Sequence, residues 1–240
     1  MAGLWRVPGG RLDWAVVVVV AFLAAVNVVD ARIAHAALVL GPAGAVALLA
    51  LGRWAGLSWA ELGLGRDTWR RGLCWALAAI GLVAVVFAAG AALPLTQSAF
   101  RNTRYDFGWS HALLTAFVLI PVGTVLFEEV AFRGVLWGLL RRRHGTWVAT
   151  SVSSALFGLW HVLPSLGLAT ADQAIGNTVG TGSSGQALSV LGTVLFTALA
   201  GVVFCELRRR SGSLLAPAGL HWATNAFGVL AAAAIWAWAT

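Results

Sequence analysis

The stretch "FEEVAFRGVLWG" (127–138) places two glutamates and an arginine in an otherwise apolar run. On membrane-insertion scales, each charge at the centre of a spanning helix costs about 2.5–3.5 kcal/mol. Glu129 and Arg133 are four residues apart with the acid first, so they can neutralise each other on one helix face. Glu128 is turned about 100° away and has no obvious partner on its own helix. An intramembrane ionisable residue is by default a functional hypothesis, and Glu128 is the sharper case of the two acids.

Two later stretches supply polar partners for these charges. "FGLWH" sets Phe157 and His161 one helical turn apart, and "HWATN" sets His221 and Asn225 one turn apart on one face. Membranes tolerate helix-breaking prolines only where protein or water covers the freed backbone, and a proline stands near each stretch: Pro121, Pro164 and Pro217. We therefore expect a polar chamber. Taken singly, the three patterns also fit structural roles, as an ion pair, a packed histidine and an interhelical hydrogen-bond pair.

The composition indicates the elements that must position these residues. Of 240 residues, 60% are hydrophobic and 10% are charged, whereas a soluble domain usually carries about 25% charge. A spanning helix needs about 20 mostly apolar residues. We expect an all-α, polytopic transmembrane bundle of about seven helices, with an eighth possible. The seven predicted spans are 14–30, 33–51, 73–93, 111–140, 146–164, 186–207 and 213–238. The chamber should lie between the fourth, fifth and seventh of them.

The arginines predict the orientation of the bundle. The chain has no lysine, and an N-terminus in the cytoplasm puts twelve of its 16 arginines in inside segments and three outside, with Arg133 in a span. Because positive residues favour cytoplasmic loops, we expect a cytoplasmic N-terminus and a chamber reached from the cytoplasmic half or the midplane. The first span is preceded by Arg6 and Arg11, but "AHA" (34–36) lies inside the next span, so an anchor is favoured over a cleaved signal peptide.

Other classes of membrane protease can be tested against the sequence. The zinc signature H-E-x-x-H and the aspartyl signature G-x-G-D are both absent. The rhomboid signature G-x-S-G is present as "GSSG" (182–185) in a Gly/Ser/Thr-rich loop, 165–185, with Ser184 just before the sixth span and His221 in the seventh. This alternative leaves the buried charges and Asn225 without a role. A transporter is a weaker interpretation, since no pair of spans resembles an inverted repeat.

The three charged and polar stretches together resemble the motifs of the CPBP family of intramembrane proteases, also called the CAAX protease or Abi family. Those motifs are Glu-Glu-x-x-x-Arg, Phe-x-x-x-His and His-x-x-x-Asn, and they stand here complete and in order. The resemblance covers about residues 55–235, with a weak upstream match at "ELGLG", and it implies a membrane endopeptidase. We therefore divide the chain into N-terminal transmembrane helices outside the resemblance, 1–54, and a protease core, 55–240.

The resemblance also implies roles for individual residues. Glu128 and His161 would activate and position a water, while His221 and Asn225 would bind the oxyanion. These roles agree with the needs of amide hydrolysis, which requires a base for water and donors aimed at the developing oxyanion.

Two further residues of the first motif, Glu129 and Arg133, would hold the shape of the site. The family is also described as metal-dependent, and Glu128, His161 and His221 could make a zinc site with two histidines and a glutamate. Asparagine is a poor zinc ligand, whereas its amide is a good donor to an oxyanion. We favour a site without a metal cofactor, with a divalent metal such as zinc as the alternative.

These patterns predict an intramembrane endopeptidase that hydrolyses a peptide bond of a membrane-associated protein or peptide. Lysine-free, arginine-rich usage indicates a GC-rich bacterial genome, so we expect a multi-pass protein of the bacterial inner membrane, surrounded by lipid and without a nucleic-acid partner. Bacteria mostly lack prenylated CAAX proteins, so the family name does not identify the substrate. The alternatives are a non-enzymatic membrane immunity or partner-binding protein, and a rhomboid-like serine protease that uses Ser184.

Overall fold

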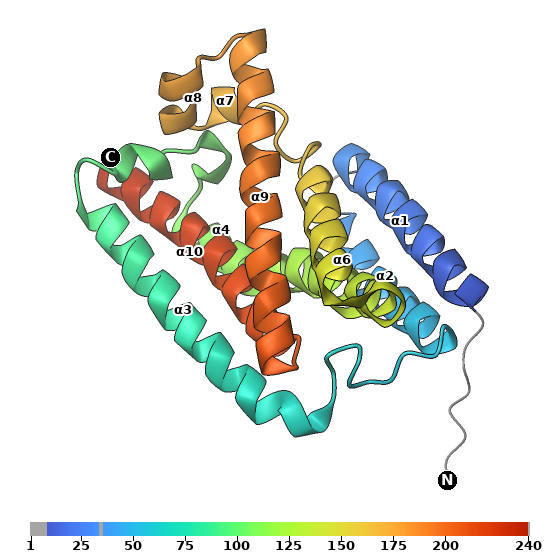
Figure 1. The fold of residues 1–240 in the computed structure, drawn as a ribbon. Helices are drawn as coiled ribbons and strands as arrows, with labels where there is room; N and C mark the ends of the chain where they lie inside the picture. The colour runs from blue at the N-terminus through green and yellow to red at the C-terminus, as the bar shows by residue number, and fades with distance from the viewer. Residues whose placement is uncertain (1–8, 34–35, 240) are drawn as a thin grey trace.

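The computed structural model describes residues 9–33 and 36–239, and this part of the chain is helical without a strand (Figure 1). Six stretches are long and apolar enough to cross a membrane, which confirms the predicted all-α membrane bundle. The long helices are α1 (Gly9–Arg32), α2 (Ala37–Trp54), α3 (Trp69–Ala92), α6 (Trp137–Trp160), α9 (Ser183–Ser211) and α10 (Leu215–Ala239), and the short α4 (Trp109–Leu114) begins the stretch that leads into α6. Between α4 and α6 the chain continues through the π-helical η4 (Thr115–Val125), α5 (Leu126–Glu128) and the π-helical η5 (Glu129–Leu136).

The longest of the six stretches, Trp109–Trp160, is a hairpin of two helices. Gly145 has φ 83° and ψ 178°, a conformation that glycine adopts readily because it has no Cβ. Three side-chain hydrogen bonds join the two arms in antiparallel register: Trp160 to Glu128, Ser153 to the Phe132 carbonyl, and Trp137 to Thr150. The chain therefore passes through this stretch twice, so that each of the seven predicted spans corresponds to a helical passage.

The second arm of the hairpin is shorter than the sequence predicts. The helix ends at Trp160, not at 164, and His161 lies in the turn beyond it instead of inside a span. Pro164 explains this early end, because the residue before a proline is pushed out of the helical region and helices usually stop at or before it.

The first arm of the hairpin runs through the middle of the bundle. Every residue from 127 to 140 is buried, and η5 packs against α1, α2, α6 and α9. A helix that is covered all round does not face lipid, so its charges meet protein instead of hydrocarbon. Packing here is tight: a Cβ on Gly41 or Gly44 of α2 would come within 2.7 Å of the Val122 carbonyl oxygen or the Phe127 ring. Close van der Waals contact of this kind holds membrane helices together.

Most of the predicted inside arginines gather at one end of the bundle, which we call the arginine face and which is built from the segments 55–68, 141–145 and 208–214. Arg142 forms an ion pair with Glu61 at 2.7 Å, and Arg208 donates to the Glu61 carbonyl at 2.9 Å. Arg71 donates to the Ser211 carbonyl at 2.7 Å, which ties the start of α3 to the end of α9. That this face is cytoplasmic remains a prediction, and Arg6 lies outside the described residues.

The opposite face of the bundle carries short helices where the sequence predicts a Gly/Ser/Thr-rich loop at 165–185 (Figure 1). Within 165–185 they are α7 (Leu168–Ala171) and α8 (Gln173–Val179). The same face also carries η2 (Gln97–Phe100) and η3 (Thr103–Tyr105) from earlier in the chain, while η1 (Arg66–Thr68) lies on the arginine face. Asp172 caps α8 by accepting a hydrogen bond from the Ile175 amide at 3.1 Å, as expected of an N-terminal aspartate. Ser184, predicted to precede the sixth span, belongs to the first turn of α9.

Candidate active site

Residues of all three motifs meet around one buried ion pair. Arg133 Nη1 donates to Glu129 Oε1 at 3.1 Å, and His221 Nδ1 donates to the same oxygen at 2.8 Å. The Arg133 guanidinium carbon lies 3.9 Å from the centre of the Phe157 ring and 4.7 Å from that of Phe204. Aromatic faces attract a cation, so two rings share the stabilisation of this buried charge with one carboxylate. Helices η5, α6, α9 and α10 each contribute one side of the cluster.

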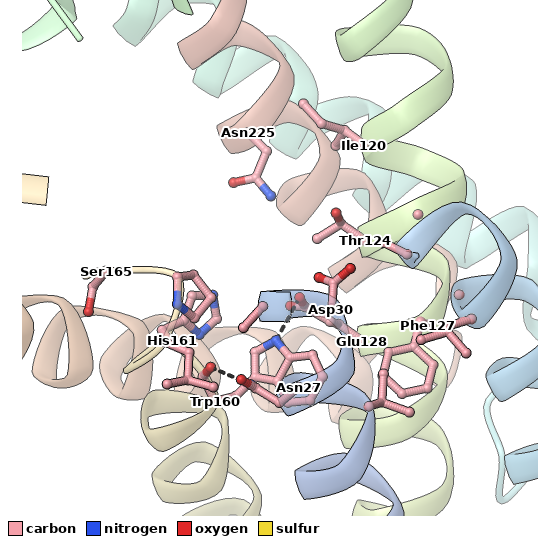
Figure 2. A pocket seen from close by; sticks show the side chains of 18 of the residues that line it. Asn27, Asp30, Ile120, Thr124, Phe127, Glu128, Trp160, His161, Ser165 and Asn225 are labelled. Carbon is pink, nitrogen blue, oxygen red and sulfur yellow. Dashed lines mark hydrogen bonds between the residues drawn. The ribbon is translucent and has the colours of Figure 1, made fainter. Parts of the chain in front are cut away.

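Glu128 has no hydrogen-bond partner on its own helix but accepts a hydrogen bond from a residue of α6. The indole N–H of Trp160 donates to Glu128 Oε1 at 2.9 Å, and the Asn27 amide donates to the Trp160 carbonyl at 2.7 Å (Figure 2). His221 Nε2 lies 3.7 Å from Glu128 Oε2, beyond hydrogen-bond distance. Oε2 is buried and has no hydrogen-bond partner among the described residues. One carboxylate oxygen is therefore held by the protein, and the other is available as an acceptor.

Glu128 borders a cavity of about 540 Å³ that is also lined by His161, Asn225 and Thr124. Figure 2 shows these side chains on different sides of the cavity, with Asn225 coming from α10 and His161 from the turn after α6. His161 Nδ1 lies 2.8 Å from the Phe157 carbonyl oxygen. A carbonyl can only accept, so Nδ1 carries a proton and Nε2 is the free nitrogen of the neutral ring. The cavity thus combines a carboxylate, an imidazole and an amide.

The expected site residues form two groups in the structure. Glu128, His161 and Asn225 line the cavity, whereas the other three are buried outside its lining: Glu129, Arg133 and His221. His221 is expected to act beside Asn225 on the oxyanion, but its Nδ1 is bonded to Glu129 and its Nε2 faces Glu128. In this arrangement its contacts are those of a group that orients the two acids.

The cavity lies toward the end of the bundle opposite the arginine face. The expectation that the chamber is reached from the cytoplasmic half or the midplane stays a prediction, because the side of the membrane that each face meets is itself a prediction. Among the described residues, the cavity walls include Asp30, Arg104 and Leu168 of the opposite face and no residue from the segments of the arginine face. The walls are also wider than the predicted fourth, fifth and seventh spans, since α1, α2 and α9 contribute. The early end of α6 accounts for this, because the turn 161–167 occupies the end of the bundle where a longer helix was predicted.

Sequence reasoning missed the contribution of α1 and of Trp160. Asn27 and Asp30 belong to no motif, and the only sequence signal for them is the pair of polar residues in "VNVVD" at the end of an apolar run. Trp160 stands inside the second motif at a position that the motif leaves open. Its indole N–H is the polar atom that distinguishes it from an apolar lining residue, because a buried indole usually finds an acceptor.

The three side chains of the alternative metal site, Glu128, His161 and His221, are not grouped as metal ligands among the described residues. In the described ranges, no group of three or more histidine, cysteine, aspartate and glutamate side chains is arranged to hold a metal ion. His161 directs Nδ1 to a carbonyl, and His221 directs Nδ1 to Glu129. Nδ1 of each histidine and one oxygen of Glu128 are thus held by protein groups. Nε2 of both histidines and Glu128 Oε2 make no hydrogen bond among the described residues, so the metal alternative stays a prediction.

The rhomboid pairing of Ser184 with His221 is not formed. Ser184 is exposed in the first turn of α9, while His221 is buried between the two acids. Within the described part of the chain, no hydrogen bond links the two residues. The serine therefore lies apart from the polar cluster and from the cavity lining.

Comparison with known proteins matches the part of the chain that carries these residues to a protease family. Residues 109–227 match the family model described as "Type II CAAX prenyl endopeptidase Rce1-like", a stretch from the start of α4 into α10 that contains all seven motif residues. The match does not include α1, α2 or α3. No curated protein and no solved structure matches the chain. Through this region, the chain belongs to the CPBP family of intramembrane proteases, the family of the type II CAAX prenyl endopeptidases.

Proposed function

We propose that this protein is an intramembrane endopeptidase that hydrolyses a peptide bond of a membrane-associated protein or peptide, with Glu128 as the base. Family membership supports protease activity in general. The observation that carries the assignment of the base is the free Oε2 of Glu128, which is buried beside a cavity of about 540 Å³. The hydrogen bond from Trp160 holds the other oxygen, so the carboxylate is oriented before substrate arrives.

The proposed reaction uses the three groups that line the cavity. A water between Glu128 and His161 transfers a proton to Glu128 Oε2 as its oxygen attacks the carbonyl carbon of the scissile bond. His161 Nε2 accepts the second hydrogen of this water and so orients it. The carbonyl oxygen becomes negatively charged, and the Asn225 amide donates hydrogen bonds to it. Glu128 then gives its proton to the leaving nitrogen as the carbon–nitrogen bond breaks, which restores the carboxylate.

The remaining motif residues position these groups. Glu129 accepts from His221 Nδ1, which fixes the imidazole with its Nε2 toward Glu128. Arg133 keeps Glu129 in place by an ion pair that has almost no exposure to solvent or lipid. In this proposal His221 is a positioning residue, and Asn225 is the principal donor to the oxyanion.

Each step of this reaction uses a protein group, and a direct measurement of metal content tests the metal alternative. Detergent-purified protein should keep its activity after exhaustive chelation, and its metal content should be well below one ion per chain. Stoichiometric zinc, with activity that is lost on removal and restored on return, would overturn the metal-free assignment.

The test of the function itself is a comparison of peptide termini in membranes that contain the full-length chain or its Glu128→Gln variant. Glutamine keeps the size of the side chain and removes the base, so a set of new termini should disappear while the protein level stays the same. Glu206→Gln is the matched control, since Glu206 is an exposed acid paired with Arg209 and Arg210 far from the cavity lining. Identical termini for wild type and Glu128→Gln would leave the protein with an immunity or partner-binding role.

A further inference from the structure

The catalytic cavity reaches the surface of the bundle at the end away from the arginine face. Asn27 of α1 is level with Trp160, and Asp30 lies about one helical turn further from the arginine face. Asp30 and Arg104 both line the cavity and are both exposed. Arg104 is anchored to the turn after α6 by a hydrogen bond of 3.0 Å to the Pro164 carbonyl. The wall at this end therefore carries charged side chains that contact the surroundings, while Glu128 lies at the buried end.

The distribution of arginines indicates which side of the membrane this end faces. The predicted inside segments hold twelve arginines and the outside segments hold three, and such an excess marks cytoplasmic loops. In the structure, contacts among Arg71, Arg142 and Arg208 and their acceptors show that segments distant in sequence share one face. A cavity at the other face is thus directed away from the cytoplasm.

A second, apolar groove runs beside the cavity toward the middle of the membrane. It has a volume of about 280 Å³, lies between α1 and α6, and shares three lining residues with the cavity: Asn27, Trp160 and Leu163. From Asn27 it extends to Val20, about two turns closer to the arginine face. Ala24 and Leu159 of its lining are exposed at the bundle surface, where lipid would surround them. An apolar segment in this groove would continue directly into the polar cavity.

We propose that the substrate is a membrane-anchored polypeptide that is cleaved at the non-cytoplasmic end of its apolar segment. The segment lies in the groove between α1 and α6, and the residues just beyond its non-cytoplasmic end enter the cavity beside Glu128. This inference rests on the proposed protease function and adds the side of cleavage and the chemical class of the substrate. It also gives α1, which the family match leaves out, a wall of the substrate site.

The side of access can be measured without cleavage. In a chain with Cys74 and Cys205 replaced by alanine, single cysteines are introduced at Thr124 in the cavity, at Leu95 on the opposite face and at His144 on the arginine face. A membrane-impermeant maleimide added outside intact cells should label Thr124→Cys and Leu95→Cys at least ten times faster than His144→Cys. Labelling of Thr124→Cys only after permeabilisation, or from neither side, would overturn the proposed side of access.

The groove is tested by two neighbouring tryptophan substitutions. Ala24 and Ala25 are both exposed on α1, but only Ala24 lines the groove. Ala24→Trp fills the groove and should lower the yield of Glu128-dependent termini about tenfold, whereas Ala25→Trp should leave it within about twofold. Equal yields for the two variants would assign the groove to lipid and overturn this part of the inference.

Mapping of the Glu128-dependent termini separates this inference from the proposed function. The termini should lie within a few residues of the non-cytoplasmic ends of apolar segments in their parent proteins. Termini at cytoplasmic ends would refute the inference while keeping the protease. An absence of Glu128-dependent termini would refute the protease, and with it the substrate assignment, even if the cavity is labelled from outside.

Discussion

Two glutamate–arginine pairs of this molecule lie in very different surroundings. Glu129 and Arg133 are buried in the central helix, with side-chain exposures of 2% and 0%, whereas Glu61 and Arg142 at the arginine face keep 35% and 30%. Arg142 donates to both carboxylate oxygens of Glu61 and to a backbone carbonyl. In the buried pair, Glu129 Oε2 and two guanidinium nitrogens of Arg133 have no hydrogen-bond partner among the described residues.

The difference shows which pair serves stability alone. At the arginine face the charges are well bonded and partly hydrated, so they tie segments together at little desolvation cost. Inside the bundle, desolvation of two charges is expensive and the bonding is incomplete, so an apolar pair of the same volume would serve packing as well or better. The buried pair is explained by what it orients, since Glu129 fixes the His221 ring that faces Glu128.

The largest expected effect comes from breaking the buried pair. Arg133→Met leaves Glu129 as an uncompensated buried charge and should destabilise the fold by about 3–5 kcal/mol. Unfolding of detergent-purified protein measures this loss, with Arg142→Met at the arginine face as the matched control. The double variant Glu129→Gln/Arg133→Met should recover part of the stability but not the activity. Equal losses for Arg133→Met and Arg142→Met would remove the distinction between the two regions.

A neutral residue of the cavity should affect rate instead of stability. Asn225→Ala removes the proposed oxyanion donor, so kcat should fall by roughly 10²–10³ with little change in KM. Asn225→Asp should be as poor or worse, because a carboxylate repels the oxyanion. Steady-state kinetics on a peptide from the terminus comparison tests this, with Thr224→Ala as the neighbouring control. A rise in KM with unchanged kcat would assign Asn225 to substrate binding.

A smaller effect is expected at Asn27, a polar, uncharged residue that is distant from the motifs in sequence. Asn27→Leu removes the hydrogen bond to the Trp160 carbonyl, a contact worth about 0.5–1.5 kcal/mol. We expect kcat to fall roughly two- to tenfold. Asn27→Gln keeps an amide donor and should restore part of the rate, whereas Asn27→Asp should not. Equal activity for all three variants would limit Asn27 to packing.

The smallest effect should be at the arginine face and should depend on pH. Partial burial acts to raise the pKa of Glu61, but hydrogen bonds from Ser58 and the charge of Arg142 outweigh it and hold the pKa below its usual 4.5. A carboxylate with a lowered pKa contributes stability above its unfolded pKa, and this contribution is lost as pH falls through the folded pKa. Glu61→Gln should therefore cost at most about 1 kcal/mol at neutral pH. The thermal stabilities of the two proteins should converge as pH falls through the lowered pKa of Glu61. A difference that stays constant with pH would contradict this origin.

Much of the fold followed from local properties of the sequence. Hydropathy marks each span because a membrane helix needs about 20 apolar residues, and the arginine breaks between spans correspond to loops of one face. The pairing of Glu129 with Arg133 also followed from helical spacing. The end of α6 was misplaced by four residues, since hydropathy continues past Trp160 through "HVL" while the backbone has already left the helix before Pro164.

The sequence by itself determined the residue types available for chemistry and the segments that carry them: Glu128, His161, His221 and Asn225 could be named from motifs whose spacing is local. Tertiary structure alone decided which of them meet. Trp160 reaches Glu128 and Asn27 reaches Trp160 across 32 and 133 residues of sequence, and no local pattern encodes such contacts. The side on which the cavity opens was also decided there, because it depends on how α1, α6 and the turn 161–167 pack around the central helix. Spacing is a property of one helix, whereas a cavity is what several helices leave between them.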